Sequence, residues 1–323
     1  MLRKALVFGA LWIVTCGILD ARAGGKLAAA QPSPAAPAAN CDKTCLDGIV
    51  DQYLAAMVAH DPSRLPLAKT VRYTENTAPM KLGDGLWQTI TGLGSYKLYI
   101  NDPTAGEVGL LAVVQENGVP DALALRLKVV KRQITEAEAI VVRKVDQPNL
   151  NVDGLVEPDP VLLETVPAGE RTSREEMISD ADKYMDGIVQ GNGAIVPFAP
   201  DAERIENGNK TCPSTASSQF GAMTCEAQFN TGRLKYIAEI SPRRYPVVDE
   251  EKGLVLSIVR FQHPANIHEV DIPGKGKVQM GGRYNQMPNS TEIAILFKIK
   301  DHKIRFIQGT VIIVPYREPL GWD

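Results

Sequence analysis

The sequence lacks the short motifs by which several large enzyme classes are recognised. Its 323 residues contain no G-x-S-x-G, no H-E-x-x-H and no G-x-G-x-x-G between a strand and a helix. These absences argue against an α/β-hydrolase, a zinc metalloprotease and a dinucleotide-binding fold. Histidine is also scarce, with four residues, and none of them belongs to a ligand set with the spacing of a known metal site. We therefore predict neither a metal nor a cofactor.

An excess of charge is missing as well. Lysine and arginine number 35 against 38 aspartate and glutamate residues, which gives a formal net charge of −3. This balance gives no electrostatic reason to expect nucleic acid or an anionic membrane surface as a partner. Aromatic residues make up only 6% of the chain, so each one in a pocket-like context carries more weight. The length favours two domains over one.

Long hydrophobic runs are absent beyond the first segment of the chain. Two basic residues precede the apolar residues 5–19, and an Ala-Arg-Ala cleavage site follows them. This pattern predicts a signal peptide over residues 1–23, with an uncleaved anchor as the alternative. Residues 24–40, rich in alanine and proline, are predicted to be a flexible tether. We expect a secreted or periplasmic protein that has no membrane contact after cleavage.

Cysteine usage agrees with export. One of the five cysteines, Cys16, lies in the predicted signal peptide, and four remain in the expected mature chain. An even number in an exported protein indicates two disulfides, with three possible connectivities. We favour Cys41–Cys45 and Cys212–Cys225 because each pair is close in sequence and lies within one repeat. Residues four apart on a helix are about 6 Å apart at Cα, which a disulfide can bridge.

The chain contains the same unit twice. Residues 53–76 and 184–207 align without a gap and share Tyr, Val, Pro, Ala, Glu and Asn at equivalent positions. A helix with one apolar stripe is predicted before each stretch, and Ser173 with Glu176 forms a capping box for the second helix. Runs typical of strands follow in both copies, at 96–101, 107–116, 122–129 and 134–143, and at 245–249, 254–262, 293–299 and 304–314. The second copy carries two insertions, 208–225 and a Gly-rich loop within 264–291.

These elements predict an α+β protein with two tandem cone-shaped domains. In each domain a helix comes first, and a curved antiparallel sheet wraps around it. We place the first domain at residues 41–144, a linker rich in Pro, Asp, Glu and Val at 145–172, and the second domain at 173–323. An internal duplication usually packs as a pseudo-twofold pair within one chain. We therefore expect an intrachain pseudo-dimer that is a monomer in solution.

Three stretches carry a resemblance to a known family. They are CDKTCLDGIVDQYLAAMVAHDPSRLPLAKTVRYTEN, GDGLWQTITGLGSY and RRYPVVDEEKGLVL. The chain resembles the nuclear transport factor 2-like superfamily, also called SnoaL-like or ketosteroid-isomerase-like, whose domains are cystatin-like cones. More narrowly, it is similar to a family of secreted tandem proteins without a settled biochemical role. The resemblance covers residues 41 to about 316 and implies the fold. Because this cone hosts dehydratases, isomerases, epoxide hydrolases, carriers and dimerisation modules, it leaves the activity open.

The repeated Glu-Asn pair is the first candidate site. Glu75 and Glu206 each end the first strand of a repeat, where a cone would leave an apolar cavity. A carboxylate there could act as a general base once burial raised its pKa. The alternative is that the glutamates stabilise a turn and that the asparagines occupy left-handed or Asx-turn positions.

Further residues could orient a ligand in such a cavity. Within the first strand, Tyr73 faces the same side as Glu75, whereas Arg72 faces the opposite side together with Asn76. Only one of these two pairs can point into a cavity. The ligand-orienting candidates from the two repeats are Arg72, Tyr73, Asn76, Asn207 and Arg244.

Four further residues complete the candidates. Trp87 could stack on a ligand at the cavity mouth, or it could be an ordinary packed tryptophan. His263 aligns with Glu116 at a strand end and could act as an acid or base near neutral pH, although strand ends also carry solvated polar residues. Arg283 and Tyr284 lie on the stretch GKGKVQMGGRY. We interpret this stretch as a mobile flap over the second cone, because it does not join a strand to a helix as phosphate-binding loops do.

The function that these features favour is the binding of a small apolar or aromatic molecule. One hypothesis is a cofactor-independent lyase, isomerase or dehydratase, with Glu75, Glu206 or His263 moving a proton. Its rivals are a non-catalytic ligand carrier and an envelope scaffold that binds another protein. The enzyme requires polar groups that converge in a cavity, the carrier requires an aliphatic cavity, and the scaffold requires filled interiors.

Overall fold

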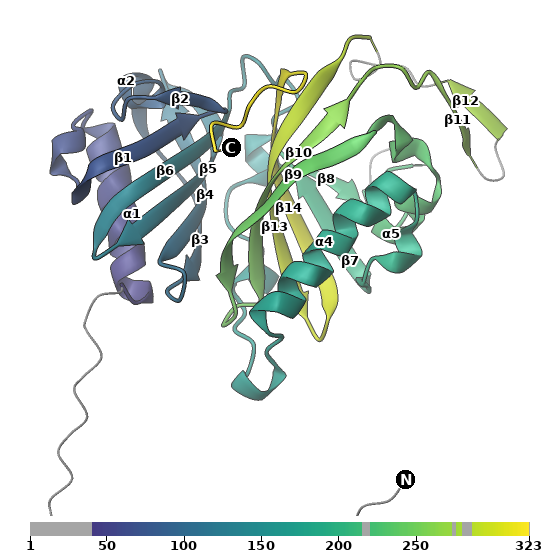
Figure 1. The fold of residues 1–323 in the computed structure, drawn as a ribbon, viewed down its shortest axis with the longest axis horizontal. Coiled ribbons are helices and arrows are strands. Elements are labelled where there is room, and N and C mark those ends of the chain that lie inside the picture. Colours follow the sequence, from purple (N-terminus) through teal and green to yellow (C-terminus); the bar gives the residue numbers. More distant parts are fainter. Residues whose placement is uncertain (1–40, 215–219, 273–275, 280–285, 323) are drawn as a thin grey trace, which may run out of the picture. The chain divides into compact units, whose positions relative to one another are not determined.

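The computed structural model describes residues 41–214, 220–272, 276–279 and 286–322 (Figure 1). Over these residues the protein is α+β, as predicted, with two six-stranded sheets and few helices. Both sheets belong to one compact unit. No helix in this part of the chain is long and apolar enough to cross a membrane.

The first sheet has the strand order β2-β1-β6-β5-β4-β3. Helix α1 (Lys43–Val58) precedes it and the short helix α2 (Leu86–Thr89) lies between β2 and β3. The strands are β1 (Leu67–Glu75), β2 (Ala78–Met80), β3 (Ile90–Asp102), β4 (Glu107–Glu116), β5 (Val119–Val130) and β6 (Gln133–Val142).

The second sheet repeats this order as β8-β7-β14-β13-β10-β9. Helix α4 (Arg174–Gln190) precedes it. The other elements of this half are β7 (Phe198–Glu206), β8 (Asn209–Cys212), α5 (Cys225–Asn230), the 3₁₀ turn η5 (Arg233–Tyr236), β9 (Glu239–Asp249), β10 (Leu254–His263), β13 (Asn289–Lys300) and β14 (Lys303–Pro315). The hairpin β11 (Glu269–Ile272) and β12 (Gly276–Gln279) lies in the second insertion.

Both sheets are mixed, which corrects the expectation of antiparallel sheets. Strand β1 runs parallel to β6, and β7 runs parallel to β14, while the other pairs are antiparallel. Each parallel pair joins the first long strand of a half to its last one. Because these two strands are not consecutive in the chain, no tight hairpin forces them to be antiparallel.

Each helix buries the stripe that the sequence predicts. Leu46, Val50 and Tyr53 of α1 are no more than 1% exposed, and Met177 and Tyr184 of α4 are no more than 2% exposed. Ser173 and Glu176 form the predicted capping box. The burial of each stripe against its own sheet forms two separate hydrophobic clusters. Burial of each large apolar side chain contributes roughly 1.5–3 kcal/mol to stability.

A third cluster lies between the two sheets. Leu98 and Leu111 of the first sheet share it with Val247, Leu256 and Leu296 of the second. The central strands are therefore buried on both faces, and β10 has no exposed residue over its whole length. This is why they read as continuous hydrophobic runs rather than as alternating ones.

Two hydrogen bonds between the halves are reciprocal. The amide of Asn101 donates to Asp249 over 3.2 Å, and the amide of Val248 donates to Asp102 over 3.0 Å. Val248 is the equivalent of Asn101 in the second copy, and Asp249 is the equivalent of Asp102. Such an exchange of equivalent contacts is characteristic of isologous interfaces.

Both predicted cysteine pairs lie at disulfide distance. Cys41–Cys45 and Cys212–Cys225 each have a Cα–Cα distance of 5.1 Å. The second pair joins the end of β8 to the start of α5, so it closes the first insertion. Disulfides are typical of proteins that fold outside the reducing cytosol.

Candidate functional site

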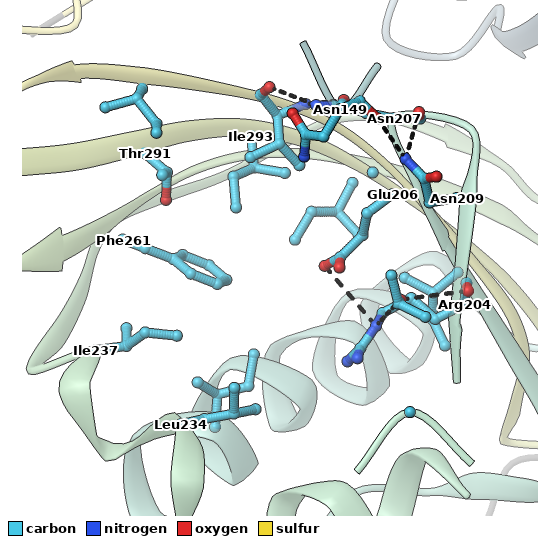
Figure 2. A pocket seen from close by; sticks show the side chains of 18 of the residues that line it. Asn149, Arg204, Glu206, Asn207, Asn209, Leu234, Ile237, Phe261, Thr291 and Ile293 are labelled. Atoms are coloured by element: carbon cyan, nitrogen blue, oxygen red, sulfur yellow. Dashed lines mark hydrogen bonds and ion pairs between the residues drawn. The ribbon is translucent and has the colours of Figure 1, made fainter. Parts of the chain in front are cut away.

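A cavity of about 490 Å³ lies between α4 and the sheet of the second half. It is lined by residues from β7, β10, β13, β14 and the turn η5 (Figure 2). Its apolar wall includes Leu234, Ile237, Phe261 and Ile293, and Arg204 and Glu206 lie across from them (Figure 2). Two groups of opposite charge thus face an apolar wall across the cavity.

Arg204 is buried and held by three acceptors. Its Nε donates to Thr211 over 2.8 Å, one Nη donates to the Tyr184 hydroxyl over 3.2 Å, and the other donates to Gln228 over 2.6 Å. Burial alone would lower the pKa of Arg204, but the nearby Tyr184 and Glu206 raise it by more than that. The guanidinium is therefore a fixed positive charge in the cavity wall.

Glu206 projects its carboxylate into the cavity (Figure 2). One oxygen lies 3.7 Å from Nε of Arg204, which is an ion pair without a hydrogen bond. The side chain is 41% exposed, against 7% for Arg204. Among the described residues, none donates a hydrogen bond to this carboxylate. The structure thus gives Glu206 the position that the sequence predicted for it.

His263 also lines the cavity, and its side chain is only 2% exposed. Nε2 lies 3.3 Å from the hydroxyl of Thr291, and the ring stacks on Tyr236 with centroids 5.4 Å apart. Burial lowers the pKa of His263 to about 4. The imidazole is therefore neutral near pH 7. This corrects the expectation that it could donate a proton as an acid at that pH.

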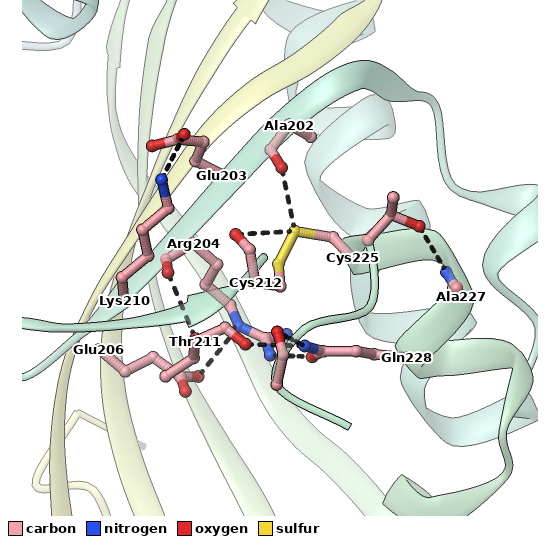
Figure 3. The surroundings of a disulfide bond; sticks show 12 residues. Ala202, Glu203, Arg204, Glu206, Lys210, Thr211, Cys212, Cys225, Ala227 and Gln228 are labelled. Carbon is pink, nitrogen blue, oxygen red and sulfur yellow. Dashed lines mark hydrogen bonds and ion pairs between the residues drawn. A yellow bond between two sulfur atoms is a disulfide. The ribbon is translucent and has the colours of Figure 1, made fainter. Parts of the chain in front are cut away.

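The Cys212–Cys225 disulfide lies near the side chains of Arg204 and Gln228 (Figure 3). Gln228 on α5 accepts from Arg204, and its amide donates to the carbonyl of Thr211 over 2.7 Å and to that of Phe220 over 3.1 Å. Phe220 and Thr211 both line the cavity. Gln228 therefore links the buried guanidinium to the insertion that the disulfide closes.

In the first half, the equivalent carboxylate is locked in place. Glu75 accepts from the Tyr73 hydroxyl over 3.0 Å, from the amide of Leu86 over 2.7 Å and from Arg143 over 2.7 Å. Arg143 also pairs with Glu116 over 2.6 Å. Tyr73 and Glu75 share one side of the strand, as predicted. Because protein donors occupy this buried carboxylate, the structure does not support Glu75 as a base or Tyr73 as a ligand contact.

Trp87 does not cover a cavity mouth, which corrects the prediction of ligand stacking. Its side chain is 0% exposed and its ring packs edge-on against Tyr53 with centroids 5.1 Å apart. Its indole nitrogen donates to the Tyr53 hydroxyl over 3.2 Å. The ring is thus part of the core of the first half, which was the alternative interpretation.

Asn76 and Asn207 are turn residues, as the alternative interpretation held, and Asn76 is not among the residues that line this cavity. Both have a positive φ of 47°. The side-chain amide of Asn76 donates to the carbonyl of Val141 and accepts from the N–H of Val141. The side-chain amide of Asn207 makes the same two hydrogen bonds with Val311. Asparagine suits this left-handed position, and its side chain replaces one rung of the sheet. The repeated Asn therefore follows from turn chemistry, although Asn207 also borders the cavity.

Arg72 and Arg244 lie away from the cavity, which corrects their prediction as ligand contacts. Arg72 donates to the carbonyl of Gly321 and stacks over the ring of Trp322 at 4.4 Å. Arg244 forms an ion pair with the buried Glu138 of the first half. Both arginines therefore join segments that are distant in sequence.

Sequence reasoning missed Arg204 and Tyr184 as site residues. Arg204 aligns with Tyr73, so the contrast between the two copies could have singled it out. Tyr184 is the tyrosine that begins the second of the two repeated stretches. Arg283 and Tyr284, predicted on the flap, lie outside the described residues. Within the described part of the chain, no group of three or more His, Cys, Asp or Glu side chains could hold a metal ion.

Residues 170–311 match the profile of a family described as a domain of unknown function, DUF8021. No curated protein matches. A de novo designed protein with a curved β-sheet is similar over 33% of this chain and 93% of its own, with 12% identity and a TM-score of 0.28. AclR from Streptomyces galilaeus, to which hydroxylase activity is ascribed, is similar over 43% and 91%, with 13% identity and a TM-score of 0.29.

Proposed function

We propose that this protein binds a small, largely apolar molecule in its second half and acts on it by proton transfer, without a cofactor. The observation that carries the proposal is the convergence of Arg204 and Glu206 on a cavity of about 490 Å³ that has an apolar wall. This volume is in the range of small-molecule sites, roughly 300–1,000 Å³. The class of reaction is that of a lyase, isomerase or dehydratase.

The chemistry follows from the two charged groups. The Glu206 carboxylate accepts a proton from an activated C–H or O–H group of the substrate. Arg204, fixed by its three acceptors, stabilises negative charge that develops on a substrate oxygen. His263 is neutral and stacked on Tyr236, so it contributes shape and an acceptor rather than charge.

The wider setting is part of the same proposal. We propose that each half is a SnoaL-like cone, that the two halves form an intrachain pseudo-dimer, and that the chain is exported after loss of residues 1–23. The reciprocal bonds of Asn101 and Val248 support the pseudo-dimer. The two disulfides support a secreted or periplasmic location.

A non-catalytic carrier is the second candidate. The many aliphatic side chains in the cavity wall favour it, including Ile237 and Ile293. An envelope scaffold receives less support, because it would require both interiors to be filled. The carrier and the enzyme share the cavity and differ only in whether Glu206 transfers a proton.

Filling the cavity tests the shared part of the proposal. Leu234 lines the cavity at the position equivalent to Trp87, so we expect Leu234→Trp to reduce binding of the neutral fluorescent probe N-phenyl-1-naphthylamine at least tenfold. The larger ring occupies space that the probe needs. A fluorescence titration measures the loss, and the Tm reports whether the variant folds.

The matched control is Leu163→Trp. Leu163 is an exposed leucine of the linker helix α3 (Pro160–Leu163) and is not among the residues lining the cavity. This variant should bind the probe like the wild type. Equal probe affinity in a folded Leu234→Trp variant and the wild type would refute the cavity as the binding site.

A further inference from the structure

We infer that the ligand of this cavity is a neutral molecule that presents a hydroxyl or N–H donor to Glu206 from an apolar body. The inference rests on the proposed function and narrows its substrate class. It comes from comparing Glu206 with Glu75, the equivalent residue in the first half of the same chain.

The first half shows how many donors this carboxylate accepts when it is enclosed. Glu75 receives three, from the Tyr73 hydroxyl, the Leu86 amide and the Arg143 guanidinium. Its side chain is only 3% exposed. A carboxylate removed from water needs such donors, since an unsatisfied one is strongly destabilising.

In the second half, all three donors are lost or withdrawn. Ile313 stands at the position of Arg143 and offers no donor. The amide of Arg233, equivalent to that of Leu86, donates instead to Thr231 over 3.1 Å. Arg204 replaces Tyr73 but stays 3.7 Å from the carboxylate. Glu206 therefore has acceptor capacity that a ligand can use.

The insertion at residues 208–225 explains why the second half lacks an equivalent of the hydrogen bond that the Leu86 amide donates to Glu75. In the first half, nine residues separate β1 from Gly85, which allows the start of α2 to reach back to Glu75. In the second half, β8, the disulfide-closed insertion and α5 come between β7 and η5. The first amide of η5, that of Arg233, donates to the hydroxyl of Thr231 at the end of α5 rather than to Glu206.

The charges of the cavity favour a neutral ligand. Arg204 balances Glu206 at 3.7 Å, and His263 carries no charge near pH 7. Lys210 at the rim pairs with Glu203 over 2.5 Å. A cationic ligand thus gains no net attraction to offset its loss of hydration. An anion meets the Glu206 carboxylate, whose repulsion offsets the attraction of Arg204.

Four probes with one apolar body test the inference. They are 2-naphthol, 2-methoxynaphthalene, 2-naphthoate and 2-naphthylmethylammonium, which differ in donor and charge. We expect 2-naphthol to bind at least tenfold more tightly than each of the others at pH 7, because only it combines neutrality with a donor. Isothermal titration calorimetry on the full mature chain gives the four affinities.

Two variants then assign the preference to Glu206. Glu206→Met removes the acceptor and should bring 2-naphthol down to the affinity of 2-methoxynaphthalene, whose own affinity stays the same. Ile313→Arg restores the donor that Arg143 supplies in the first half, and it should also abolish the preference. If either variant fails to fold, the four wild-type affinities decide the question.

Each outcome bears on a different claim. Binding of all four probes with similar affinity, or tightest binding of the anion or the cation, overturns this inference and leaves the proposed cavity intact. A preference for 2-naphthol that survives in folded Glu206→Met overturns the role of Glu206. Binding of none of the probes contradicts the proposed function itself.

Discussion

Replacing Glu206 with glutamine is expected to slow the exchange of the α-protons of 2-tetralone by about 100-fold or more, the effect typical of losing a general base. This ketone is neutral, apolar and enolisable, so it suits the cavity. Glutamine keeps the size of the side chain but accepts no proton. Arg204 remains in place to bind the carbonyl oxygen, so binding should change much less than exchange.

Proton NMR in D₂O measures the exchange rate with and without protein. Asp201→Asn is the matched control, because Asp201 lies on the same strand, pairs with Arg305 and is not a cavity residue. It should exchange the ketone like the wild type. Binding of 2-tetralone without any acceleration of exchange by the wild type would favour the carrier over the enzyme.

Replacing Arg143 with methionine is expected to destabilise the protein by about 3 kcal/mol, the lower end of the range for breaking a buried ion pair. Arg143 pairs with Glu75 over 2.7 Å and with Glu116 over 2.6 Å. Its removal leaves Glu75, at 3% exposure, without its cation. The estimate is at the lower end because Arg143 itself is 21% exposed.

Urea unfolding followed by circular dichroism gives this difference. Arg305→Met is the control, since Arg305 pairs with Asp201 at the surface and such pairs contribute about 0–1 kcal/mol. A loss of under 1 kcal/mol in Arg143→Met would show that the first interior is not held by this ion pair. The Arg143–Glu75 ion pair would then no longer explain why the cavity lies in the second half and not in the first.

The duplicated architecture could be predicted because its signals are local. The apolar stripes that include Tyr53 and Tyr184 have helical spacing, and the Ser173 cap is encoded within four residues. The cysteine pairs could also be predicted from the sequence, because the two cysteines of each pair are close in sequence. The parallel pairing of β1 with β6 was not, because it joins strands separated by most of a domain.

The asymmetry between the halves depends on distant residues, which limits prediction. Whether Glu75 is locked depends on Arg143, which lies 68 residues further along the chain. In the second half, the position equivalent to Arg143 is occupied by Ile313, on the last strand. Alignment of the two copies shows these differences. Only the fold shows that Arg143 contacts Glu75 and that Ile313 lines the same cavity as Glu206.

The repeated Asn illustrates the opposite case. Asn76 and Asn207 recur because both turns require a left-handed residue whose amide can bond to the next strand. A repeated residue can thus reflect shared folding rather than a shared site. The functional signal lies instead where the copies differ, at Tyr73 against Arg204 and at Arg143 against Ile313.

The most direct measurement is the location of bromine in crystals of residues 24–323 soaked with 6-bromo-2-naphthol. Anomalous scattering places the bromine without a choice of model. The account predicts one strong site within the second half, inside the cavity bordered by Phe261 and Ile293, with the hydroxyl at Glu206. Bromine beside Trp87 in the first half, or only on the protein surface, would contradict it.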